Sequence, residues 1–169
     1  MLLIENIGTL VGYDQLNCTL SLMHKVELLV EHDRIAWIGF AHERPVAEID
    51  ERIDALGKVV MPGLIDCHSH LIFTGSRAHE FGLRMQGLSY QEIMAEGGGI
   101  MATVTKTRAA SDEELLRLAH MRADKMLERG VTTVEAKSGY GLSCEHELRI
   151  LRLLKKLDTT HAIDIHSTF

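Results

Sequence analysis

Residues 59–70 read VVMPGLIDCHSH, and this stretch decides the fold class. The segment Val59–Asp66 is mostly apolar apart from a Pro-Gly pair, which is typical of a buried strand in a parallel sheet. Two histidines, His68 and His70, follow at its end. Residues two apart on a strand point to the same face, so both imidazoles can reach one cation. Neutral imidazole suits zinc and iron, although two surface histidines at a strand end would have the same spacing.

Strands and helices alternate after this stretch. The expected order is a long connection over 71–110 with one short helix opened by Ser89, a helix from Ser111, a strand over 131–136, a helix from Ser143 and a strand over 162–169. Such alternation predicts parallel strands with right-handed crossovers. A complete (β/α)₈ barrel needs about 250 residues. The sequence therefore predicts an α/β protein containing the first strands and helices of a partial (β/α)₈ TIM-like barrel, in which strand ends face the active site.

The first sixty residues have a different character. They are rich in short β-prone runs and contain no convincing helix. Two of these runs, over 26–30 and 35–38, flank a polar turn at 32–34, which indicates a hairpin. The pattern changes at residue 59, which separates a strand-rich region from the alternating one.

Composition excludes several classes of protein. The chain has 169 residues, a net charge of −6 and no run of Lys and Arg, which argues against a nucleic-acid or membrane partner. Its three cysteines are odd in number and widely spaced, as in a cytoplasmic protein with reduced thiols. No segment resembles a signal peptide or approaches the roughly 20 apolar residues of a spanning helix. We therefore expect a soluble cytoplasmic protein.

Several motifs resemble a known family. Residues 60–70 resemble the first barrel strand of the amidohydrolase superfamily. The stretches FTGSRAHEF at 73–81, GGGI at 97–100, TV at 103–104 and GVTTVEAKSGYGL at 130–142 closely resemble imidazolonepropionases, a family within that superfamily. The resemblance implies a metal-bearing barrel combined with a small β-sandwich. Its expected domains are part of an N-terminal β-sandwich over 1–60 and the first βα units of a barrel, incomplete relative to the family, over 61–169.

The resemblance also implies roles for individual residues. His68 and His70 match the paired ligands of one divalent metal ion, zinc or iron. Arg77 matches the arginine that binds the substrate's carboxylate, and Tyr140 matches a tyrosine that contacts the substrate. The residues alone favour a solvated surface charge at Arg77 and an amphipathic loop residue at Tyr140. The catalytic acid–base groups and remaining ligands are expected downstream of Phe169, so none is expected within this chain.

The function implied by the resemblance is metal-dependent hydrolysis of the cyclic amide C–N bond of 4-imidazolone-5-propanoate. The product is N-formimidoyl-L-glutamate, and the step belongs to histidine degradation. We expect a small-molecule substrate, an inactive isolated chain, and leave open a homodimer of the full-length protein. The alternatives are another amidohydrolase, cytosine-deaminase-like or hydantoinase-like, a non-catalytic assembly module, or a short metal-binding protein using the same two histidines.

Other polar residues receive plainer interpretations. The glycines 97–99 lack the GK[ST] sequence of a phosphate loop and are expected to let a loop backbone pass close to a substrate. Lys137 is interpreted as structural, with Glu135 as its partner. His166 lies in a late strand, where the ligand interpretation is the less favoured one.

Overall fold

The computed structural model describes all residues, 1–169, as two compact units, Met1–Pro62 and Gly63–Phe169. Each unit has its own sheet, and all five α-helices belong to the second unit. The expected α/β fold class is confirmed. No helix has the length and apolarity needed to cross a membrane.

The first unit is a five-stranded sheet. Its strands are β1 (Leu2–Asp14), β2 (Thr19–Glu31), β3 (Arg34–Gly39), β4 (Glu51–Asp54) and β5 (Val59–Val60), with a short 3₁₀ helix at Ala41–Glu43. The order is β3-β2-β1-β4, and β5 pairs with β1. Antiparallel pairing of β2 with β3 confirms the expected hairpin. Ile7, Leu10, Val26 and Leu28 form the core of this unit. Its assignment as part of a β-sandwich stays a prediction.

The expected single strand over Val59–Asp66 is wrong. Val59 and Val60 pair with Thr9 and Leu10 of β1, whereas β6 (Leu64–Ser69) begins a different sheet. The break falls at Met61-Pro62-Gly63, because proline lacks an N–H for a ladder and glycine weakens a strand. The expected burial is wrong too, since β6 is an edge strand and Ile65 is 71% exposed.

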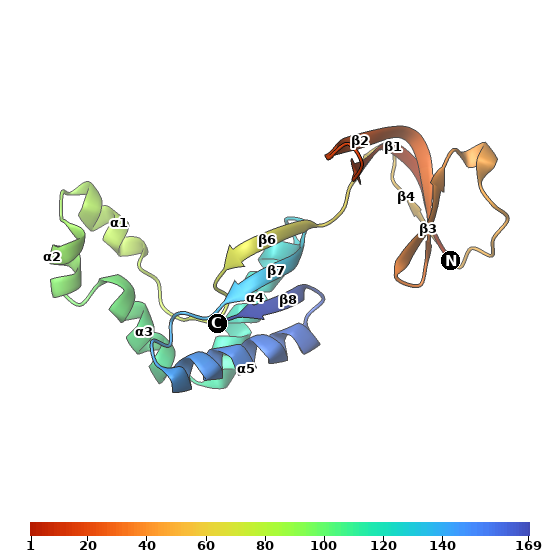
Figure 1. The fold of residues 1–169 in the computed structure, drawn as a ribbon. Helices are drawn as coiled ribbons and strands as arrows, with labels where there is room; N and C mark the ends of the chain where they lie inside the picture. Colours follow the sequence, from red (N-terminus) through yellow and green to blue (C-terminus); the bar gives the residue numbers. More distant parts are fainter. The chain divides into compact units, whose positions relative to one another are not determined.

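The second unit is a parallel sheet with helices packed on it. Its order is β6-β7-β8, with β7 at Val131–Lys137 and β8 at Asp164–Thr168. Helices α4 (Asp112–Leu127) and α5 (Cys144–Thr160) connect these strands, which confirms the expected alternation (Figure 1). Ser111 and Ser143 cap the two helices by accepting backbone N–H bonds. The core unites both helices with the sheet through Leu115, Ala119, Val134, Leu154, Leu157 and Ile165.

The connection between β6 and α4 is more helical than expected. It contains α1 (Ala78–Met85), α2 (Tyr90–Ala95) and α3 (Gly99–Ala109), of which only α2 was predicted. The predicted helix is opened by Ser89, which forms a capping box with Glu92. Buried Glu80 accepts the N–H of Gly99 at 2.8 Å, and this contact ties α1 to the start of α3. Short helices are marginally stable in water by themselves, and this tertiary contact stabilises α1 and α3.

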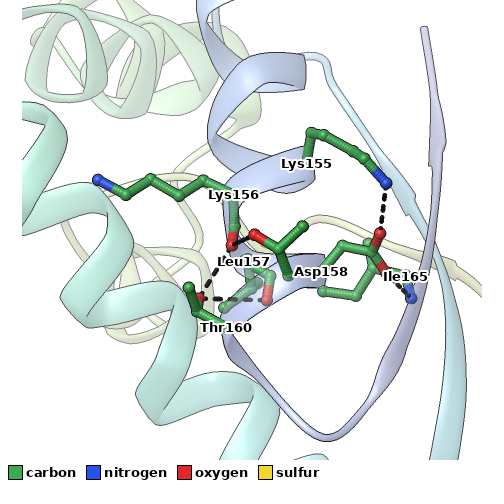
Figure 2. Close-up of polar contacts among 7 residues, drawn as sticks. Lys155, Lys156, Leu157, Asp158, Thr160 and Ile165 are labelled. Carbon is green, nitrogen blue, oxygen red and sulfur yellow. Dashed lines mark hydrogen bonds and ion pairs between the residues drawn. The ribbon is translucent and has the colours of Figure 1, made fainter.

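A polar cluster fixes the passage from α5 to β8. Asp158 accepts the backbone N–H of Ile165 at 3.1 Å and a bond from Lys155 at 2.8 Å (Figure 2). The Thr160 hydroxyl donates to the Lys156 carbonyl at 2.9 Å. The last turn of the helix therefore sets where the next strand begins.

Candidate active site

The carboxyl ends of β6, β7 and β8 lie at one edge of the sheet because the three strands are parallel. In β7, Val134 and Ala136 are buried in the core with the helices, so Glu135 between them lies on the opposite face. His166 of β8 is the register partner of Glu135 and is exposed. This face thus carries polar side chains from neighbouring strands.

His68 and His70 lie together at the end of β6. Their ring centroids are 5.9 Å apart and the rings are steeply inclined at 71°. Nδ1 of His70 is 3.0 Å from the Lys137 carbonyl oxygen, which can only accept, so Nδ1 carries the proton. That tautomer leaves Nε2 of His70 with a free lone pair, as in histidines that bind metals.

Two carboxylates, Asp66 of β6 and Glu135 of β7, accept hydrogen bonds near the ends of these strands. Asp66 accepts from the Ser69 hydroxyl at 2.6 Å and from the His68 N–H at 3.0 Å, and these bonds lower its pKa in that order. Glu135 pairs with Lys137, as the sequence predicted, and accepts from the Thr168 hydroxyl at 2.9 Å. The bond from Lys137 is the largest cause of the lowered pKa of Glu135. Asp66 and Glu135 are therefore both ionised, and each is hydrogen-bonded to donors close to it.

Tyr140 packs against His70. Its ring centroid is 5.1 Å from that of His70 and 5.3 Å from that of Phe73. Arg122 of α4 covers the Phe73 ring at 3.7 Å and donates to the Leu71 carbonyl at 2.7 Å. A series of contacts from Arg122 through Phe73 and Tyr140 therefore connects α4 to His70. Sequence reasoning missed Arg122 and Phe73, whose contact depends on residues about fifty positions apart.

Glu147 is the other functional candidate that sequence reasoning missed. It is buried at the start of α5 and accepts N–H bonds from Gly139, Gly141 and Leu142. Burial is the largest influence on its pKa and raises it, but the bonds from Leu142, Gly139, the Ser138 hydroxyl and Gly141 outweigh burial and lower the pKa. Only the two glycines beside Tyr140 signalled such a loop in the sequence.

Arg77 is placed apart from these contacts. It lies at the N-cap of α1 and is partly buried, and its side chain makes no hydrogen bond, ion pair or cation–π contact within the chain. The structure therefore brings His68, His70 and Tyr140 together and leaves the guanidinium of Arg77 unpartnered. The role expected for Arg77 stays a prediction.

The donor set fits part of a metal site. His68 and His70 offer two imidazoles on one strand end, and the proton of His70 is already directed away from its ligating nitrogen. No group of three or more His, Cys, Asp or Glu side chains is arranged to hold an ion. A catalytic zinc typically has three protein ligands, so these residues could supply two of them.

Comparison with solved structures defines the class of protein. The chain superposes on atrazine chlorohydrolase from Arthrobacter aurescens, complexed with zinc and atraton, with a TM-score of 0.63 and 16% identity, covering 100% of this chain and 35% of that one. An amidohydrolase matches with a TM-score of 0.59 and 20% identity over 99% of this chain and 31% of its own. The fold is that of the amidohydrolase superfamily.

Sequence relatives narrow that class, although no protein-family profile matches the chain. Imidazolonepropionase of Bacillus cytotoxicus is 44% identical over 99% of this chain and 42% of its own length. Imidazolonepropionase of Geobacillus kaustophilus is 48% identical over 89% of this chain and 37% of its own. The chain is similar to imidazolonepropionases over almost its whole length and spans about two-fifths of the length of these relatives.

Proposed function

We propose that this chain carries the first part of an imidazolonepropionase active site. The reaction is hydrolysis of the cyclic amide C–N bond of 4-imidazolone-5-propanoate to N-formimidoyl-L-glutamate, within histidine degradation. The observation that carries the proposal is the pairing of His68 with His70, whose Nδ1 bonds to a carbonyl while Tyr140 packs on its ring. The names of the sequence relatives support the same reaction.

We assign one divalent cation, zinc or iron, to His68 and His70. When bound, such a cation lowers the pKa of a water molecule toward about 7 and so supplies a nucleophile at neutral pH. The Lys137 carbonyl holds the proton of His70 on Nδ1 and keeps the ring in one orientation. The zinc complexed with atrazine chlorohydrolase, whose fold this chain shares, supports this donor chemistry.

Arg77 and Tyr140 are assigned to the substrate, a small molecule. Arg77 has no carboxylate of its own chain to pair with, so its planar fork is available for the propionate group. The Tyr140 ring lies against His70 and can cover the face of a flat heterocycle, while its hydroxyl offers a hydrogen bond. These two residues therefore bind and orient the substrate, and neither transfers a proton in this assignment.

We further propose that the 169 residues do not turn over substrate by themselves, because two imidazoles are fewer than a catalytic zinc requires. A cytoplasmic location fits the three cysteines, which are all free.

Zinc titration followed by calorimetry tests the site. We expect the chain to bind one Zn²⁺ weakly, and His68→Ala or His70→Ala to reduce the affinity at least about tenfold. His24→Ala is the control, because His24 lies on the first sheet, where it hydrogen-bonds Thr9, and its loss should leave zinc binding unchanged.

Two outcomes contradict the proposal. Zinc binding that survives loss of both histidines would place the cation elsewhere. Metal-dependent release of N-formimidoyl-glutamate by the 169 residues would show that the site is complete without further ligands.

A further inference from the structure

The loop Ser138–Leu142 after β7 is held by one carboxylate. Oε2 of Glu147 accepts the Gly139 N–H at 2.7 Å, and Oε1 accepts those of Gly141 at 2.8 Å and Leu142 at 2.6 Å. No cation pairs with this buried acid. Three converging N–H groups therefore stabilise its charge, as they would stabilise a bound anion.

The loop is also confined from both sides. Gly139 has φ +139°, and a Cβ built there would lie 3.0 Å from Cε1 of His70. A Cβ on Gly141 would lie 2.6 Å from the backbone nitrogen of Glu147. The loop backbone thus fills the space between the His70 ring and the first turn of α5, and a shift at one side must appear at the other.

Further bonds leave the loop little freedom. Arg108 donates to the Gly141 carbonyl at 2.7 Å, and the Ser138 N–H donates to the Thr168 carbonyl at 2.9 Å. The N–H groups that Glu147 accepts are not available to a ligand. What the loop presents toward His70 is the ring of Tyr140, 5.1 Å away.

We propose that Glu147 is a positioning residue that fixes the rings of Tyr140 and His70 against each other before any ligand arrives. It acts through the backbone of Ser138–Leu142 and touches neither substrate nor metal. The importance of this positioning for catalysis rests on the proposed function, in which Tyr140 contacts the substrate and His70 binds the cation.

The test compares Glu147→Gln with Glu145→Gln. Both lie in the first turn of α5, but Glu145 is exposed and makes no side-chain hydrogen bond, so it controls for charge near the helix terminus. Two signals are read by NMR without metal: hydrogen exchange of the Gly139, Gly141 and Leu142 amides, and the Hε1–Cε1 cross-peak of His70. We expect Glu147→Gln to accelerate exchange about tenfold and to move the His70 peak.

A second variant keeps the test possible if Glu147→Gln does not fold. Gly141→Ala keeps the carboxylate but pushes the loop from the helix, so it should move the His70 peak in the same way. A His70 peak unchanged in both variants would overturn the proposal, because Glu147 would then only anchor backbone.

The outcome is separable from the fate of the proposed function. The NMR signals are read without metal or substrate, whereas zinc binding tests the function. If the chain binds no zinc but the His70 peak moves in the variants, the positioning role of Glu147 stands and the proposed metal site is wrong.

Discussion

At the scale of single residues, two buried acids organise the regions that resemble the family. Glu80 and Glu147 are the buried charged side chains, and each accepts N–H bonds from glycines of a neighbouring segment. A buried carboxylate is tolerated when charge-assisted bonds offset its desolvation. In the sequence, Glu145 and Glu147 both fit the favourable end of a helix dipole. Only the packing of α5 against the loop distinguishes them.

Acid should weaken the second unit partly through Glu147. Its folded pKa lies below the ordinary value, so the unfolded chain binds this proton more readily. The stabilisation is present above the ordinary glutamate pKa of about 4.3 and is lost as pH falls through the lowered folded value. Urea unfolding of this unit, followed from about pH 7 down to pH 3, measures the slope. Glu147→Gln should flatten it, whereas an unaltered slope would contradict this account.

At the scale of elements, the helices with a clear N-cap signal and the strands that follow them were predicted well. The capped helices α4 and α5 and the strands between them lie where periodicity placed them. The run at 59–70 and the connection 71–110 were predicted wrongly. Val59 and Val60 pair with a strand fifty residues earlier, and α1 is joined to α3 by Glu80. Local patterns carry no information about such partners.

The passage from α5 to β8 provides a test at this scale. Asp158→Ala removes the acceptor of the Ile165 N–H and should cost about 1–2 kcal/mol of unfolding free energy. Lys155→Met removes only the outer ion pair with Asp158, where Lys155 is 74% exposed, and should cost less than about 0.5 kcal/mol. Chemical denaturation of both variants measures the difference between their unfolding free energies. Equal losses would assign the stabilisation to the ion pair instead.

At the scale of the whole molecule, the chain has two cores. One unites residues of β1 and β2 with Ala55, and the other unites β7, β8, α4 and α5. Each core is formed by residues of one unit. We therefore expect each unit to respond to substitutions in its own core.

Leu154→Ala tests this expectation. Leu154 is fully buried in the second core, so truncation should cost that unit about 2–5 kcal/mol. Trp37, the single tryptophan, lies in β3 and reports on the first unit, whereas helical circular dichroism reports on the second. The variant should shift the helical transition and leave the tryptophan transition in place. A matching shift of both signals would show that the units unfold together.

The sequence by itself determined the fold class, the order of β6, α4, β7, α5 and β8, and the histidine pair. Each depends on neighbours within a few residues: strand alternation, helix caps and the two-residue repeat of a strand face. Tertiary structure alone decided the pairing of Val59 and Val60 with β1, the tautomer of His70, the contacts from Arg122 through Phe73 to Tyr140 and the burial of Glu147. Each of these depends on which segments lie side by side in space, and no local pattern encodes that.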